Sequence, residues 1–573
     1  MYNDLCCYKS LCLFYGHLLI ILSSFPFAFL WFCSSDNFFY IYILLLIILF
    51  LIYLFKCGVQ ISITKASVFS ILLLVYIISG INHELLEYRY IKILNIAIFF
   101  LFFETGSSFF NKYKILSRNM LLITFGLFYV FGAAKLIFHN GTFTDFVEFH
   151  FTNTGLFSLY ITLFMVGILC EYKEITLKRK NVLCIILLVI TLFCILYMKS
   201  RLSIVIFITY IALGLLSKSR RATTKCFILA FIILAIIALA LCVKRDSTLG
   251  RWFILKTSMR IISDNIIAGI GYGNFPIVYP KYQASQYQKG HVTIEESQLL
   301  DNTTVALNEF IQLLAELGVI GGVLFLFFVN SFYKYNPNSR KKLICISLAI
   351  CMSYILHNNY ISYLIVYQSL FLYTPTVFRL GEKTSSYILK ISIFLAIGIL
   401  CIYTYKAHVE DLAKKMWVVS PDKMNNFYDR NYQLLQDIPY FIFKLAKYNY
   451  CNNNLKMALL LLSHLDKNIV RNDIELLKAE CYEKLYANAL AEKHFLQSIA
   501  ICPNRYINRY KLFRFYSKIG ENFKATIVAK EILAMPPKVT SVHTIAIKNE
   551  IYNYLTKNGL PSRKESCNFE KKE

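Results

Sequence analysis

Residues 244–308 read KRDSTLGRWFILKTSMRIISDNIIAGIGYGNFPIVYPKYQASQYQKGHVTIEESQLLDNTTVALN, the only long polar interruption in a series of apolar segments between residues 11 and 405. The chain has 573 residues and is 57% hydrophobic, which is too much apolar surface for a protein that folds in water. A helix of about 20 residues crosses the hydrocarbon core of a bilayer. The sequence therefore predicts an all-α, polytopic membrane helical bundle, with this stretch as its longest loop.

The apolar blocks are separated by short charged connectors and predict about thirteen membrane spans. The first block is too long for the apolar region of a cleavable signal peptide, so we expect it to be the first span. The predicted spans are residues 11–33, 38–55, 66–82, 91–105, 118–138, 154–171, 181–198, 201–217, 225–243, 310–329, 341–356, 360–379 and 386–405.

The formal net charge of +26 is concentrated in alternate connectors. Lys and Arg gather at 112–118, 173–180, 218–225 and 334–342, whereas the connectors 34–37, 140–151 and 357–359 are nearly free of them. Basic connectors stay in the cytoplasm, which explains much of the charge without a nucleic-acid partner. We therefore expect the 244–308 loop, and everything after residue 406, to face outward.

The seventeen cysteines do not form a metal-site pattern. Many lie inside apolar blocks, among them Cys184, Cys194 and Cys345, where cysteine behaves as a small core residue. The predicted outer side has no Asp-x-Asp pair and no His/Cys cluster. The sequence predicts neither a metal nor a cofactor.

The tail from about residue 407 to 573 is charged, shows helical periodicity and contains no further spanning run. It repeats at an interval of 34 residues, which resembles tetratricopeptide helix pairs, although a generic helical tail is the alternative. The repeating positions are Tyr482, Ala491 and Pro503, followed by Tyr516, Ala525 and Pro537. The predicted domains are 1–243 (N-terminal membrane helices), 244–309 (outer loop), 310–406 (C-terminal membrane helices) and 407–573 (tetratricopeptide-like repeats).

Three arginines are candidates for binding a phosphate group. Arg201 begins an apolar segment at its predicted outer mouth, where a charge is functional unless it merely marks the end of a span. Arg251 and Arg260 flank the amphipathic stretch RWFILKTSMR, which can lie in the membrane surface and offer bidentate donors to phosphate. A solvated basic face is the alternative for this pair.

Two further motifs end the loop. GIGYGNF at 269–275 lacks the strand and the acidic residue of a dinucleotide site, so we expect a tight turn whose N–H groups can approach an anion. LNEFIQLLAELGVIGG at 307–322 places Asn308 and Glu309 at the start of a membrane helix. Glu309 is a candidate catalytic acid or base, or it simply begins the helix with favourable dipole geometry.

The order of these motifs resembles the O-antigen ligase and O-antigen polymerase superfamily of bacterial membrane proteins, over roughly residues 180–330. Members typically carry His-Asn followed by two spaced glycines, and Asn308, Gly318 and Gly321 fit that spacing. Leu307 occupies the position of the histidine. Because leucine cannot transfer a proton, either another group takes over or the branch uses charge stabilisation alone. The candidates for this replacement are Glu309, His291 and His357.

The resemblance implies that Arg201 and Arg251 bind the diphosphate of a lipid-linked donor, whereas Arg260 is added from the residue pattern alone. It also implies an inverting glycosyltransferase that moves a glycan from an undecaprenyl-diphosphate carrier to an acceptor such as lipid A core. Arginines at the outer membrane surface would stabilise the leaving diphosphate.

Two alternatives stay open at this point. A polysaccharide polymerase of the same superfamily is one, and a transporter of the lipid-linked glycan is the other, although the chain lacks the two matching broken halves typical of transporters. We expect a multi-pass protein of the bacterial inner membrane with a periplasmic loop and tail. A protein partner could bind the repeats, and no nucleic-acid partner is expected.

Overall fold

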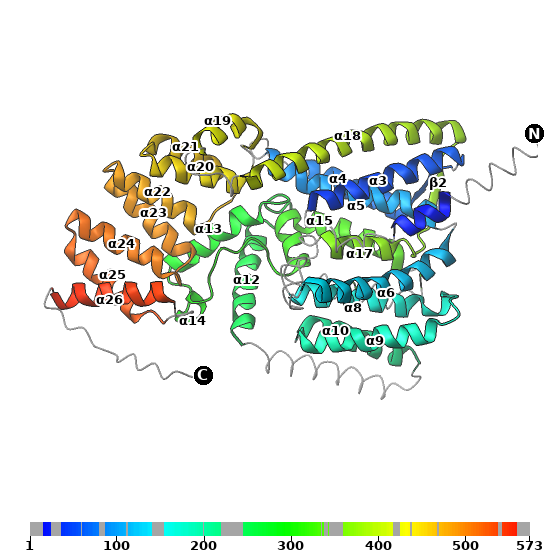
Figure 1. Ribbon diagram of the computed structural model, residues 1–573, viewed down its shortest axis with the longest axis horizontal. Helices are drawn as coiled ribbons and strands as arrows, with labels where there is room; N and C mark the ends of the chain where they lie inside the picture. Colours follow the sequence, from blue (N-terminus) through cyan, green and yellow to red (C-terminus); the bar gives the residue numbers. More distant parts are fainter. Residues whose placement is uncertain are drawn as a thin grey trace, which may run out of the picture. The chain divides into compact units, whose positions relative to one another are not determined.

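The computed structural model describes residues 15–23, 36–58, 60–79, 86–110, 113–139, 154–198, 200–218, 245–333, 335–336, 342, 346, 359–415, 424–435, 438–466, 469–536 and 541–557. The chain divides into two compact units (Figure 1). The membrane unit comprises Met1–Arg245, Ile262–Gly273 and Val305–Phe427. The tail unit comprises Asp246–Ile261, Asn274–Thr304 and Tyr428–Glu573.

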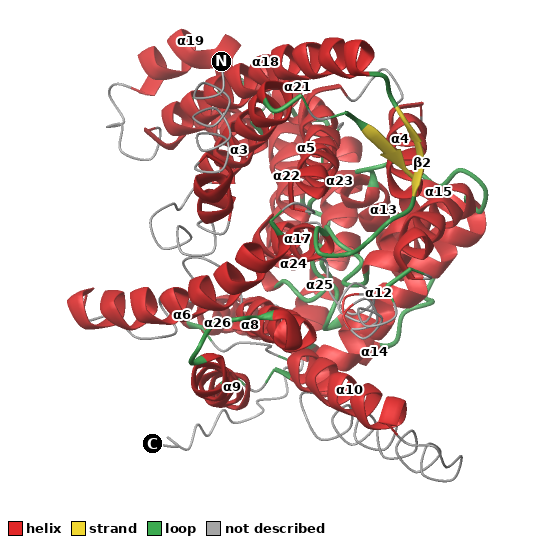
Figure 2. Ribbon diagram, turned by 90° about the vertical axis from the view of Figure 1, so that its right-hand side faces the viewer, coloured by secondary structure: helices red, strands yellow, loops and turns green. Residues whose placement is uncertain are grey.

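The membrane unit is built from long apolar helices and one short antiparallel strand pair, whose β2 strand is visible in Figure 2. Its helices are α3 (Asp36–Lys56), α4 (Lys65–Ser79), α5 (Leu86–Phe110), α6 (Lys114–His139), α8 (Thr154–Glu171), α9 (Lys180–Tyr197), α10 (Arg201–Lys218), α15 (Glu309–Tyr333), α17 (Asn359–Ser369) and α18 (Glu382–Lys415), with the short 3-10 turn η1 (Tyr172–Glu174). The strands are β1 (Ser62–Thr64) and β2 (Thr376–Arg379).

Within the described ranges, five helices are long and apolar enough to cross a membrane. These are Phe39–Lys56, Gly155–Glu174, Lys180–Tyr197, Glu309–Tyr333 and Glu382–Ala413. The protein is therefore a multi-pass membrane protein, largely helical as predicted. The total of thirteen spans stays a prediction, because span 225–243 and most of 341–356 lie outside the described residues.

The predicted span 360–379 is wrong in its second half. Helix α17 ends at Ser369, and the chain then turns into β2. Pro375 disfavours helical backbone at Thr374 before it, so a helix cannot continue through residues 374–379. The Pro375 carbonyl accepts a hydrogen bond from the Lys65 N–H at 3.1 Å, so this turn satisfies one of the open donors at the start of α4.

Aromatic side chains fill the interior between α3, α5 and α17. Phe50 and Phe109 stack with ring centroids 4.9 Å apart, and Phe110 meets Tyr367 edge-on at 5.5 Å. All four side chains are fully buried. Such rings bury large apolar areas and prefer these offset and edge-on geometries, which gives the bundle a fixed core.

The tail unit consists of helices, most of them joined in antiparallel pairs. They are α13 (Phe275–Gln288), α14 (Ile294–Ser297), α19 (Met424–Leu435), α20 (Pro439–Cys451), α21 (Leu455–Leu465), α22 (Asn472–Lys484), α23 (Asn488–Ile501), α24 (Tyr506–Ile519), α25 (Asn522–Ala534) and α26 (Val542–Lys557). Helix α12 (Arg245–Asp264) contributes most of its length to this unit.

The helix pairs of the tail follow the interval found in the sequence. Asn472 and Tyr506 begin successive first helices, and Asn488 and Asn522 begin successive second helices, 34 residues apart in each case. Ala491 and Ala525 are completely buried, as expected for small residues that let paired helices approach closely. The helix boundaries keep the 34-residue interval, and the tetratricopeptide-like fold of the tail stays a prediction.

Candidate functional site

Helix α15 is broken at Gly318, whose backbone is not helical (φ 62°, ψ −166°). A break leaves backbone donors and acceptors open, which is costly in a membrane helix. The turn at residues 266–271 satisfies several of them in both directions. The N–H groups of Val319 and Ile320 donate to the carbonyls of Ile266 (2.9 Å) and Ile267 (3.4 Å), and those of Ile270 and Gly271 donate to Ala315 (2.9 Å) and Glu316 (2.8 Å).

Glycine is required on both sides of this junction because the two backbones nearly touch. A Cβ at Gly318 would lie 2.2 Å from the carbonyl oxygen of Ile267, and a Cβ at Gly269 would lie 2.5 Å from the carbonyl of Glu316. Both glycines also have positive φ, which L side chains rarely adopt. The GIGYG run is therefore a tight turn, as predicted. The expectation that its N–H groups approach an anion is wrong for Ile270, Gly271 and Gly273, because these groups donate to α15.

Three polar side chains of α15 are buried on one face of the helix. Glu309, Gln312 and Glu316 are separated by three and four residues, and they are 4%, 6% and 2% exposed. The two Glu316 oxygens accept hydrogen bonds from the Gly273 N–H (2.9 Å) and from Gln312 Nε2 (3.3 Å). Gln312 Oε1 accepts from the Ala306 N–H at 3.1 Å. We call Glu309, Gln312 and Glu316 the acidic face.

Tyr272 belongs to the same site. Its pKa is raised well above the usual value, first by burial and then by the negative charges of Glu316 and Glu309. The phenol is thus close enough to both carboxylates for their charges to raise its pKa, and it stays protonated at neutral pH. A protonated phenol can donate a hydrogen bond, so Tyr272 adds a possible donor to the acceptors of the acidic face.

Asn308 caps α15, since its Oδ1 accepts from the Ile311 N–H at 3.1 Å. Leu307 before it has a positive φ of 54°, an uncommon conformation for a leucine. Glu309 is the first helical residue and lies at the positive end of the helix dipole. Asn308 therefore has a structural use as the cap of α15, and Glu309 begins the helix next to it.

The predicted arginines occupy less informative positions. Arg201 begins α10, but its side chain lies outside the described residues. Arg251 is exposed and Arg260 is half-buried on α12. Nine residues advance a helix by about 14 Å and two and a half turns, so these two side chains leave opposite sides of the helix.

The two predicted histidines also lie apart from the acidic face in the sequence. His291 is exposed and follows α13, and His357 lies outside the described residues. His291, Arg251 and Arg260 belong to the tail unit, whereas Asn308 and Glu309 belong to the membrane unit.

Sequence reasoning missed Glu316 and Tyr272 as functional candidates. A usable signal existed for Glu316, because a lone acid seven residues after Glu309 in an apolar helix must share its face. Tyr272 gave no such signal, since its position depends on how the turn packs against the break. Among the described residues, no group of three or more His, Cys, Asp or Glu side chains could hold a metal ion.

Comparison with known families identifies the part of the chain that carries this site. Residues 186–326 match a family model described as O-antigen ligase. No curated protein is detectably similar to the chain. The matched stretch contains the 266–273 turn, the Gly318 break and the whole acidic face. Residues 186–326 are therefore similar to the O-antigen ligase family.

Proposed function

We propose that the protein is a glycosyltransferase that moves a glycan from an undecaprenyl-diphosphate carrier to an acceptor hydroxyl, with Glu309 as the general base. The observation that supports this most strongly is the buried acidic face, because it lies inside the family domain and at the start of a membrane helix. A carboxylate shielded from water and within reach of a hydroxyl can accept its proton as the bond to the sugar forms.

The two carboxylates of the acidic face have different roles in this proposal. Both oxygens of Glu316 accept hydrogen bonds, so this carboxylate holds the turn and Gln312 in place. Glu309 takes the part that the family histidine would play, since Leu307 cannot transfer a proton. Tyr272, kept protonated by its surroundings, can donate a hydrogen bond to the acceptor or the leaving oxygen.

The donor diphosphate needs positive charge as the bond to the sugar breaks. We propose Arg201 and Arg251 for this task, with Arg260 as a weaker candidate because it leaves α12 on the opposite side from Arg251. Arg251 is exposed next to Trp252, whose side chain is 62% exposed. A basic residue beside an exposed tryptophan is typical of a helix lying at a membrane surface, where a lipid diphosphate would be found.

The reaction in this proposal takes place at the outer face of the bacterial inner membrane. The basic connectors stay in the cytoplasm, which leaves the 244–308 loop and the tail on the periplasmic side. Lipid A core or another surface glycan is the proposed acceptor. A polymerase, for which the acceptor is a second lipid-linked unit, is the alternative within the same superfamily. The replacement of the ligase histidine by Leu307 supports this alternative.

The test is a strain that lacks the protein, complemented with the wild type or with Glu309→Gln at equal membrane level. Ligase function predicts that lipid-linked polymer accumulates while the acceptor remains uncapped. Polymerase function predicts that single lipid-linked units accumulate and reach the acceptor unpolymerised. Normal surface glycan in the deletion strain would contradict both.

A further inference from the structure

The outer loop and the C-terminal tail are one folded body in the tail unit. Residues 274–304 of the loop and the helices after residue 428 cluster together, although more than 120 residues of chain separate them. Helix α13 of the loop packs against α23 of the tail. The loop and the tail therefore fold together as one unit.

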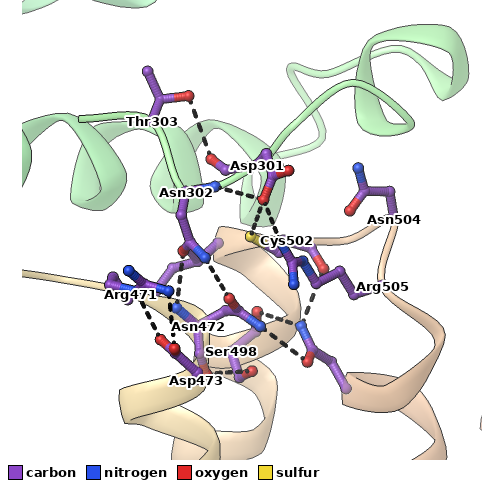
Figure 3. A network of polar contacts seen from close by, with 12 residues as sticks. Asp301, Asn302, Thr303, Arg471, Asn472, Asp473, Ser498, Cys502, Asn504 and Arg505 are labelled. Carbon is purple, nitrogen blue, oxygen red and sulfur yellow. Dashed lines mark hydrogen bonds and ion pairs between the residues drawn. The ribbon is translucent and has the colours of Figure 1, made fainter. Parts of the chain in front are cut away.

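Residues 298–303 of the loop contact the ends of α22, α23 and α24 (Figure 3). Asn302 and Asn472 form a reciprocal pair: Asn302 Nδ2 donates to Asn472 Oδ1 at 2.6 Å, and the Asn472 N–H donates to Asn302 Oδ1 at 3.1 Å. Arg505 donates to Asp301 Oδ1 at 2.9 Å, and Asn504 Nδ2 donates to the Gln298 carbonyl at 2.9 Å. We call these contacts the loop clamp.

Buried groups support the loop clamp from both sides. Gln283, which is 1% exposed, donates through Nε2 to the carbonyls of Asp301 (3.0 Å) and Ile501 (2.7 Å), which ties the loop to α23. Asn472 also donates to Asn508 Oδ1 at 3.2 Å, and both asparagines are almost fully buried. Buried amides that satisfy each other fix one arrangement, because any shift leaves polar groups unpaired.

The loop clamp lies directly before the candidate site in the sequence. Asn302 is seven residues upstream of Glu309, and the Ala306 N–H between them donates to Gln312 of the acidic face. Only residues 304–308 separate the clamped residues 301–303 from the start of α15 in the chain. A displacement of about 1 Å at a reacting group can cost a hundredfold in rate.

We propose that the C-terminal tail holds the outer loop so that Glu309 is presented correctly, with Asp301 and Asn302 as positioning residues. This inference rests on the proposed function for its effect on transfer, and on the tail-unit contacts alone for its effect on the loop. In this proposal the loop occupies the ends of α22–α24, so a protein partner would have to bind another surface of the tail.

The experiment compares full-length wild type, Asp301→Arg, the reversed pair Asp301→Arg/Arg505→Asp, and Glu550→Arg in lipid nanodiscs. Glu550 is the matched control, because it is an acid of similar exposure (48% against 47%) paired with Arg514 at 3.4 Å within the tail. Amide exchange of residues 298–304 reports the loop, and kcat and KM for a lipid-linked glycan donor report the transfer.

We expect Asp301→Arg to speed amide exchange in 298–304 and to lower kcat about tenfold or more, with the donor KM within about twofold of wild type. The reversed pair should recover most of both losses, and Glu550→Arg should show neither. Faster exchange with an unchanged kcat, or an equal loss in Glu550→Arg, would overturn the positioning role. If the wild type transfers no glycan, the proposed function fails, and unchanged exchange in Asp301→Arg would separately overturn the loop clamp.

Discussion

The segment between residues 262 and 304 is held at its two ends by different chemistry. At the membrane-unit end, backbone groups of 266–271 bond to the broken helix α15, and two glycines allow the close approach. At the tail-unit end, side-chain amides and an ion pair hold residues 298–303. In an apolar setting every backbone group must be satisfied locally, whereas a partly exposed site can use longer polar side chains.

The two ends therefore tolerate different substitutions. The membrane-unit junction leaves no room for a side chain at Gly269 or Gly318, so any larger residue there should clash with the backbone opposite. The tail-unit junction distributes its contacts over many side chains, so single changes there should loosen the loop gradually.

The largest effect is expected from Gly318→Ala. The new Cβ would lie 2.2 Å from the Ile267 carbonyl oxygen at a residue with φ of 62°, so the junction must separate. We predict a loss of at least about 2 kcal/mol of stability, together with loss of transfer. The measurement is the thermal unfolding midpoint of the purified protein.

Gly398→Ala is the matched control for this change. Gly398 lies in α18 with no atom within 4 Å of a built Cβ, so alanine there should be neutral or slightly stabilising. An equal loss in both variants would show that the membrane unit is sensitive to alanine in general, and that the Gly318 junction has no special role.

A smaller effect is expected from Glu316→Gln. The carboxylate accepts from Gly273 and Gln312, and an amide cannot accept on both sides. One buried donor would be left facing an NH2 group, which costs about 1–3 kcal/mol. The unfolding midpoint should fall, while exposed Glu382→Gln should leave it unchanged. An unchanged midpoint in Glu316→Gln would show that this carboxylate does not hold the turn.

The two regions should also lose stability at opposite ends of the pH scale. In the tail, burial raises the pKa of Glu475, but the hydrogen bond from His494 and the charge of Lys478 together lower it below the usual value. Its stabilising contribution is therefore present above about pH 4.3 and is lost as pH falls through the lowered pKa. Glu475→Gln should flatten the acid limb of a stability-against-pH curve. An unchanged acid limb would contradict this assignment.

At the membrane-unit junction the sign is reversed. The raised pKa of Tyr272 means that stability is complete below about pH 10 and is lost as pH rises towards the folded-state pKa. Tyr272→Phe should reduce the alkaline slope by up to about 1.4 kcal/mol per pH unit. Chemical denaturation at several pH values measures both limbs, and a Phe variant with the wild-type alkaline slope would contradict this assignment.

Much of the helical architecture could be predicted because lipid imposes a length on each apolar block. Helix α8 begins and ends at the predicted residues 154 and 171, and the tight turn at GIGYG was expected from its glycines. The second half of span 360–379 was mispredicted, because the local effect of Pro375 outweighs the apolar composition around it.

Only part of the candidate site could be predicted from the sequence. Glu309 stood out by its position at a helix start, but Tyr272 and Glu316 meet across a helix break that no hydropathy pattern reveals. The loop clamp depends on pairing residues such as Asn302 and Asn472, which are 170 positions apart. Contacts of that range between common polar residues leave no periodic signal in one sequence.

The most direct test is glycan transfer by purified, folded Glu309→Gln, measured beside Glu316→Gln with a lipid-linked donor and an acceptor. We predict that Glu309→Gln still folds and inserts into the membrane but lowers kcat at least about a hundredfold, because it loses a proton acceptor. Glu316→Gln should lose stability and retain more activity than Glu309→Gln. A Glu309→Gln protein that transfers glycan at the wild-type rate would contradict the assignment of Glu309 as the base.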